Sequence, residues 1–211
     1  MKKLIVLGLL ILISCQAIAQ NKKLYEASTN KFEFVAVPKL GYARLIETGN
    51  GPVTGFINAG DLLLSFQLGK EFKLASGLGM IQFDFNRTFA GNTTSFRNSY
   101  LRVPLNLIGT YSIYKVKPTN ESVFLTYGFG FYANNLIKQE IDTGIVATST
   151  SNLGWNFGYS IQLGMKFIVS DALNLGVGYE VQSDFSKIKS NGTEQKLEGL
   201  NTINFTIGFK L

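Results

Sequence analysis

The chain contains 211 residues, of which 45% are hydrophobic, 13% aromatic and 16% charged, and its formal net charge is +6 at pH 7. This composition excludes an intrinsically disordered chain, and a single cysteine excludes a fold built on internal disulfides. The absence of histidine removes the commonest general base and the commonest metal ligand. The length fits one domain with a sizeable core.

The first twenty residues have the pattern of an export signal. Two lysines precede an apolar run at 4–13, and the small-residue pattern Ala-Ile-Ala follows at 17–19. This order is typical of a secretory signal peptide, and the apolar run is too short to span a bilayer as a helix. We expect cleavage near Ala19/Gln20, so that residues 1–19 are removed.

A second cleavage site competes with the first. Residues 12–15, Leu-Ile-Ser-Cys, resemble the lipobox of bacterial lipoproteins, in which the cysteine is acylated. Cleavage at Ala-Ile-Ala would instead remove Cys15. It leaves one domain at 20–211 with a net charge near +4 and no basic stripe, so no nucleic-acid partner is expected.

The rest of the chain alternates between apolar and polar residues. The clearest case is 153–167, where every odd position is large and apolar and every even position is glycine, polar or charged. Such alternation is typical of β-strands. The pattern slips near Met80 and Ile81, and Pro104 interrupts another strand, so we expect a β-bulge at each place. Eight strands are predicted, at 32–45, 62–68, 74–85, 101–107, 123–131, 153–167, 173–181 and 203–211.

The predicted connections alternate in length, as in an up-and-down meander. Two are short, at 70–73 and 168–172, and one is intermediate, at 111–121. The sequence therefore predicts an all-β fold, an eight-stranded antiparallel up-and-down transmembrane β-barrel preceded by a cleaved signal peptide. The long polar connections are expected at 46–58, 87–98, 134–151 and 183–199.

The polar face of the strands indicates which side is inside. It consists of Gly, Asn, Ser, Thr and Gln with few charges, whereas the outside of a soluble, lipocalin-like carrier would be charged. A membrane barrel turns its apolar face to lipid, here the outer-membrane lipid, and places small polar residues in a narrow lumen. A periplasmic lipocalin-like carrier is the alternative. Aromatic side chains expected at the lipid interfaces, or else packed in an ordinary core, are Trp155, Phe167, Tyr179 and Phe209.

Residues 100–107, Tyr-Leu-Arg-Val-Pro-Leu-Asn-Leu, resemble a strand motif of the outer-membrane β-barrels of Bacteroidetes-type bacteria. That group includes the PorT-like family and is similar in size to the OmpA and OmpX barrels. The C-terminal segment 205–211 resembles the signal that the barrel-assembly machinery reads. The resemblance implies a location in the Gram-negative outer membrane and the barrel-assembly machinery as a partner. By family alone, it also implies a role in a secretion apparatus.

The sequence predicts no catalytic site. Outer-membrane barrel enzymes of the resembling class pair a histidine with serine or aspartate, and this chain has no histidine. The glycine pairs at 128–130 and 176–178 lie inside strands, so we expect close packing in the lumen and no phosphate loop. We therefore expect no enzymatic activity, no cofactor and no metal.

Charged residues on the polar face are the first candidate site. We expect some of them to pair and plug the lumen, because an eight-stranded barrel leaves little space and unpaired buried charges are costly. An ion pathway lined by the same residues, as in a small passive channel or transport accessory, is the alternative. These residues are Glu33, Lys39, Asp61, Arg102, Lys166, Glu180 and Lys210.

The long loops are the second candidate site, since loops on a rigid barrel commonly carry binding. We expect a structural or interaction role through them, with an extracellular or envelope protein as partner. A solvated polar cap without a ligand is the alternative. The residues concerned are Lys138, Glu140, Asp142, Asp184, Phe185, Lys187 and Lys189.

Overall fold

The computed structural model describes residues 31–69, 71–89, 91–115, 122–190 and 193–211. The expected signal peptide and the alternative lipobox lie outside these residues. Within them, no helix is long and apolar enough to cross a membrane.

The predicted eight-stranded antiparallel barrel is confirmed. Each long strand pairs antiparallel with its neighbour in chain order, and the first long strand pairs with the last to close the ring. One additional short strand pairs only with the beginning of the last strand. The strands are β1 Phe32–Glu47, β2 Asn50–Gln67, β3 Phe72–Phe89, β4 Asn92–Lys115, β5 Ser122–Asp142, β6 Ala147–Ile168, β7 Leu173–Asp184, β8 Ile188–Ser190 and β9 Thr193–Lys210.

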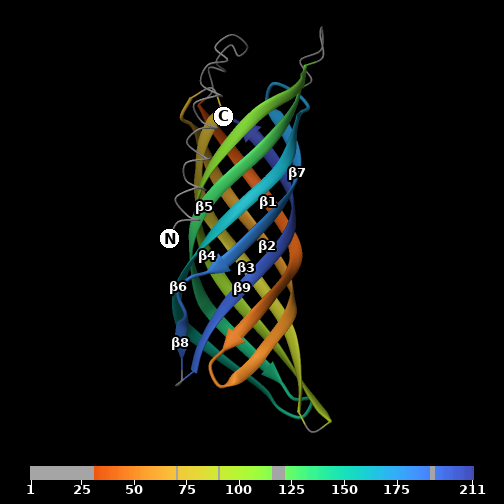
Figure 1. The fold of residues 1–211 in the computed structure, drawn as a ribbon, viewed down its shortest axis with the longest axis vertical. Helices are drawn as coiled ribbons and strands as arrows, with labels where there is room; N and C mark the ends of the chain where they lie inside the picture. Colours follow the sequence, from red (N-terminus) through yellow and green to blue (C-terminus); the bar gives the residue numbers. More distant parts are fainter. Residues whose placement is uncertain (1–30, 70, 90, 116–121, 191–192) are drawn as a thin grey trace, which may run out of the picture.

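The barrel is tall and its strands are strongly tilted (Figure 1). At one end, which we call the terminal end, β1 begins, β9 finishes, and short turns join β2 to β3 and β6 to β7. At the opposite hairpin end lie the β1–β2, β3–β4 and β5–β6 turns and β8. In Figure 1 the terminal end is at the top.

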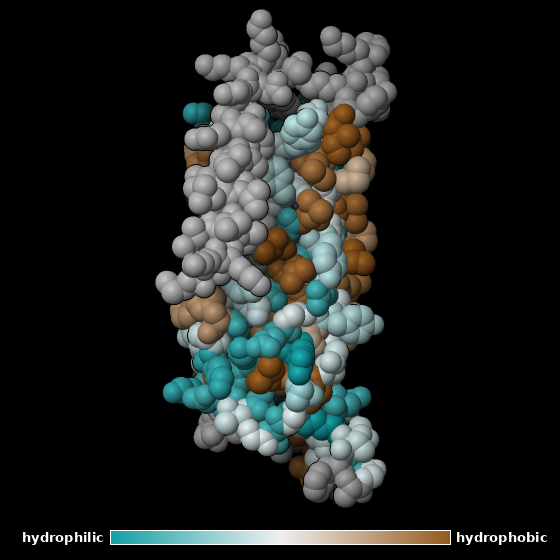
Figure 2. All heavy atoms as spheres, in the orientation of Figure 1, coloured by the Kyte–Doolittle hydropathy of each residue, from teal (hydrophilic) through white to brown (hydrophobic). Residues whose placement is uncertain are grey.

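Large apolar side chains point outward around the half of the barrel at the terminal end. They remain about half exposed because they have no neighbour on that side within the described chain; Phe34, Leu64, Leu105, Phe131 and Ile161, each on a different strand, are 42–53% exposed. Figure 2 shows this apolar belt as brown atoms in the upper part of the molecule, above a hydrophilic lower part. The predicted orientation of the apolar face is therefore present over this half.

The polarity inverts toward the hairpin end. There the outward side chains are polar or charged, such as Arg44, Asp84 and Arg97. The inner face is an apolar core, which is how a barrel surrounded by water is packed. The buried core residues are Ala43, Leu45, Ile57, Ile81, Phe83, Phe85, Tyr100, Leu136, Leu153, Ile188, Leu197 and Leu200.

Both predicted bulges are wrong, and the inversion explains the first of them. The ladders of β3 run without a register shift past Met80 and Ile81, and the change there is that the inward side chains become apolar. Pro104 also lies in a continuous register, with its side chain turned inward. Its carbonyl accepts a hydrogen bond from Ser76 Oγ at 2.8 Å, so a neighbouring side chain contacts the strand at the proline.

A real bulge occurs where the sequence pattern was most regular. The register between β5 and β6 shifts near Leu136 and Gly154, and Gly154 has a φ of 117°. The shift turns Leu153 inward, where it is 7% exposed in the apolar core. The prediction that Leu153 shares the outward face of Trp155 is therefore wrong.

We expect Gly154→Val to lower the free energy of unfolding by about 1–3 kcal/mol, because a β-branched residue is strained at positive φ. The measurement is urea unfolding of the folded barrel in lipid vesicles. The matched control is Gly51→Val, since Gly51 lies in a strand, is exposed and has no atom within 4 Å of an added Cβ. Equal losses for the two variants would contradict the strained bulge.

All four predicted long loops are also wrong. Residues 46–58, 87–98 and 134–151 lie mostly in strands, joined by short turns at the hairpin end. These segments are rich in Ser, Thr and Asn, and threonine is favoured in strands. Outward apolar residues no longer alternate with inward polar residues there, because these parts of the strands lie beyond the apolar belt. The described part of the fourth segment, 183–199, also lies mostly in strands: the end of β7, all of β8 and the beginning of β9.

Candidate functional site

A layer of buried charges crosses the middle of the lumen; we call it the middle layer. Lys39 Nζ lies 2.7 Å from Asp61 Oδ2 and 2.6 Å from Glu180 Oε2. Arg102 Nη2 lies 3.6 Å from Glu180 Oε1. All four side chains are only 1–3% exposed, so two cations and two carboxylates balance each other away from water.

Polar contacts connect the middle layer to the hairpin end. Arg102 donates a hydrogen bond to Gln182, and its guanidinium lies 4.4 Å from the ring centroid of Tyr132. The Tyr132 hydroxyl donates to Asp184 Oδ1 at 2.9 Å. Asp184 also accepts from the backbone N–H of Leu197 at 2.7 Å, at the edge of the apolar core. The charges and the core therefore form one continuous closure of the lumen.

A second charged group, the terminal layer, lies at the terminal end. Glu33 forms ion pairs with Lys73 and with Lys166, whose Nζ is 3.4 Å from Glu33 Oε1. Asn174 donates a further hydrogen bond to Glu33. Two ammonium groups thus share one carboxylate, in contrast to the balanced middle layer.

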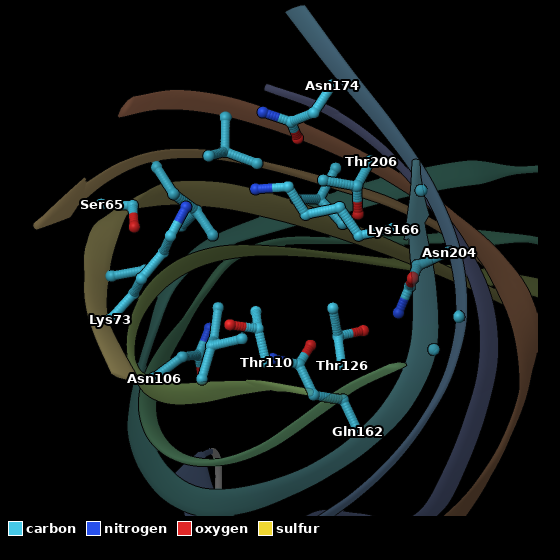
Figure 3. A pocket seen from close by; sticks show the side chains of 18 of the residues that line it. Ser65, Lys73, Asn106, Thr110, Thr126, Gln162, Lys166, Asn174, Asn204 and Thr206 are labelled. Carbon is cyan, nitrogen blue, oxygen red and sulfur yellow. The ribbon is translucent and has the colours of Figure 1, made fainter. Parts of the chain in front are cut away.

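A cavity of about 90 Å³ separates the two layers. Figure 3 shows Lys73 and Lys166 extending into it among hydroxyl and amide side chains. Part of its wall is apolar, formed by Val35, Val37 and Leu63. The space left in the lumen is therefore small, with charged and polar groups set in a partly apolar wall.

The seven predicted lumen charges have different outcomes. Six of them lie in the two layers, and Lys210 forms no ion pair within the described residues, although it pairs in register with Glu33. Lys73 and Gln182 were not predicted, because one predicted strand begins one residue too late, at 74, and another ends one residue too early, at 181. Both have the parity of the inward face, so extending the alternation by one residue would have found them.

The predicted interface aromatics all point outward and are 39–49% exposed. Trp155 lies toward the hairpin end of β6, while Phe167 and Phe209 lie next to the strand ends at the terminal end. Tyr179 lies near the middle of β7, and its hydroxyl donates to Asn201 Oδ1 at 2.7 Å. Three of the four thus lie toward a strand end and Tyr179 lies within its strand, while their place at a lipid interface stays a prediction.

Four strands continue past the ring at the hairpin end. Pairing of β2 with β3 stops at Phe56 and Asp84, and pairing of β6 with β7 stops at Gly158 and Asp184. Beyond these points β3, β4, β5 and β6 still pair with one another, as far as the turns at the tip. We call this four-stranded part the extension. Its β6 edge, residues 147–151, is exposed and has no strand partner on its outer side among the described residues.

The predicted loop charges lie on the surface around the extension, except Asp184, which is buried. Arg97 Nε is 2.8 Å from Asp84 Oδ1, and Lys138 pairs with Glu140. On the β8–β9 hairpin, hydrogen bonds from Lys187 and Lys189 hold the pKa of Glu194 below its ordinary value. Exposed pairs of this kind contribute little to stability.

Several solved structures have a similar chain path. Neisserial surface protein A is 12% identical over 85% of this chain and 97% of its own, with a TM-score of 0.49. Ail, the attachment invasion locus protein of Yersinia pestis, is 11% identical over 86% and 100%, with a TM-score of 0.37. OprG, an outer membrane protein from Pseudomonas aeruginosa, is 9% identical over 88% and 99%, with a TM-score of 0.38.

All three TM-scores lie below 0.5, so the architecture rests on the strand pairing of this chain and not on these similarities. No protein-family model matches the sequence, and no curated protein matches it either.

Proposed function

We propose that the chain is a non-catalytic integral protein of the Gram-negative outer membrane, with its terminal end toward the periplasm and its hairpin end outside the cell. The observation that carries this proposal is the outward apolar belt around a closed ring. Lipid accepts apolar side chains on the outside of a barrel, and a closed ring leaves no unpaired strand edge in the hydrocarbon. A lipocalin-like carrier would turn the same side chains inward.

A charge placed in the belt tests the membrane location. Leu105→Arg is expected to cost about 2–4 kcal/mol of unfolding free energy in lipid vesicles, because an arginine would face lipid. Ser99→Arg is the matched control, since Ser99 points outward from the same strand but beyond the belt, and it should cost less than 1 kcal/mol. Equal costs would contradict a belt surrounded by lipid.

The closed lumen supports a role other than conduction. The middle layer and the apolar core lie in series along the barrel axis, so an ion would have to displace both. We expect no steady conductance when the purified barrel is inserted into planar bilayers, under conditions where a porin control conducts. A steady conductance would instead favour the passive channel.

The extension is the best candidate for protein binding. Residues 147–151 of its β6 edge read Ala-Thr-Ser-Thr-Ser and carry none of the lysines or prolines that usually block edge pairing. Such an edge can accept a strand from another chain through backbone hydrogen bonds. We therefore infer that an extracellular or envelope protein binds at this edge.

The test is cross-linking in intact cells, comparing the native chain with the double variant Ser149→Lys/Ser151→Lys. We expect the cross-linked species to disappear, because lysines along an edge oppose strand addition. Ser95→Lys is the control: Ser95 is exposed, but it lies on β4, which is paired on both sides within the same extension. Cross-links that survive in the double variant would contradict binding at the edge.

We propose a membrane component of a secretion apparatus as the second candidate, which rests on sequence resemblance alone. The octapeptide at 100–107 that resembles the PorT-like motif lies in β4, where it supplies Arg102 to the middle layer. The C-terminal strand, with Phe205, Ile207 and Phe209 facing outward, fits a signal for the barrel-assembly machinery. Partners that co-purify equally with the native chain and the edge variant would favour this candidate.

A further inference from the structure

The terminal layer carries an excess of positive charge. In the middle layer, two cations face two carboxylates. In the terminal layer, Lys73 and Lys166 share Glu33. Asp61 is the other carboxylate that lines the cavity among the described residues, and it is already paired with Lys39 of the middle layer. Because the charges are largely removed from water, an excess cation in this position is unfavourable unless something balances it.

One hydrogen-bond donor beside the two ammonium groups has no partner in the described part of the protein. Ser65 is 2% exposed, and its hydroxyl has no hydrogen-bond partner among the described residues. It lines the same cavity as the two ammonium groups and as Asn106, Thr110 and Asn174 (Figure 3). Ammonium and hydroxyl groups donate hydrogen bonds, and bonds from charged donors to an oxyanion are the strong ones.

Among the described residues, the cavity opens toward the terminal end and is closed on the other side. Lys73 and Lys166 keep 16% and 14% of their side chains exposed, which places them at an opening toward the terminal end. On the opposite side, the middle layer and the apolar core close the lumen. The volume of about 90 Å³ suits one small ion and excludes a large solute.

We propose that this cavity binds one small oxyanion of the phosphate class, held by Lys73, Lys166 and Ser65, and entering from the terminal end. The apolar wall formed by Val35, Val37 and Leu63 strengthens the attraction, because a low local dielectric enhances the interaction between charges. The site lies at the opposite end of the barrel from the proposed protein-binding edge. A negative result for phosphate binding would therefore leave the proposed protein binding untouched, and the reverse.

The test is thermal unfolding of the mature barrel in a non-ionic detergent with increasing inorganic phosphate. Ionic strength is held constant with an organic anion too large for the cavity. Because a ligand that binds only the folded state stabilises it, we expect the midpoint of unfolding to rise with phosphate and to follow a binding isotherm. No saturable rise in the native chain would overturn the proposal.

Three variants locate the site. Lys73→Met and Lys166→Met each leave Glu33 with one cation, so the barrel keeps a balanced pair while the phosphate-dependent rise is lost. Ser65→Ala keeps every charge and should weaken phosphate binding by about tenfold, a typical value for one lost hydrogen bond. The control is Lys189→Met, whose 80% exposed side chain lies at the hairpin end and should leave binding unchanged.

The variants also separate the proposal from general salt effects. A rise that survives in both Lys73→Met and Lys166→Met would show that phosphate acts elsewhere on the protein and would overturn the site. If either lysine variant does not fold, Ser65→Ala alone decides, because unchanged phosphate binding in that variant would contradict the placement.

Discussion

Replacing Lys39 with methionine is expected to lower the free energy of unfolding by about 3–5 kcal/mol, among the largest effects of any single substitution in this barrel. Lys39 Nζ is within 2.7 Å of carboxylates on both Asp61 and Glu180, and all three groups are almost completely buried. Removing the ammonium leaves two carboxylates with only Arg102 to balance them. The measurement is urea unfolding in lipid vesicles.

A double variant separates the charge effect from the loss of packing. In Lys39→Met/Asp61→Asn, the remaining Arg102 and Glu180 still form a balanced pair. We expect this variant to be more stable than Lys39→Met alone, with a coupling energy of about 1–3 kcal/mol between the two positions. Lys189→Met, at an exposed surface position, should change stability by less than about 0.5 kcal/mol. A cost for Lys39→Met as small as that of Lys189→Met would contradict the middle layer.

Alternation in the sequence predicts the fold well because lipid and lumen impose opposite polarities on successive residues. This holds from the terminal end through the belt, where Leu163, Met165 and Phe167 face outward as expected. The alternation no longer predicts the inward side where the strands leave the apolar belt. In the proposed membrane setting, water replaces lipid beyond the belt, so Phe83 and Phe85 turn inward and the polar strands of the extension resemble loops in the sequence.

The charged layers were only partly predictable from the sequence, because their contacts depend on which strands are neighbours in the closed ring. Parity places Glu33, Lys39 and Glu180 on the inner face, but it does not say which strands bring their side chains together. The pairing of Lys39 with Glu180 joins residues 141 positions apart and depends on closure of the ring through β9. Register across the closed barrel is a property of the whole fold, so local sequence cannot supply it.

The apolar core inside the hairpin half leads to the second large effect. Phe83→Ala is expected to cost about 3–5 kcal/mol, because Phe83 is fully buried and its truncation leaves a cavity in the core. The ring also stacks on Phe85 with centroids 5.1 Å apart, and Phe85 stacks on Phe96 at 4.8 Å. The measurement is again urea unfolding in lipid vesicles.

The matched control is Phe131→Ala, in the apolar belt, where the ring is 53% exposed and lipid can fill the space that it leaves. We expect a clearly smaller loss than for Phe83→Ala, because a position that can be refilled has no cavity cost. If the lumen were polar along its whole length, Phe83→Ala would instead be the milder change. The order of the two losses therefore distinguishes a barrel with an inverted, water-adapted half from a barrel with the same polarity from end to end.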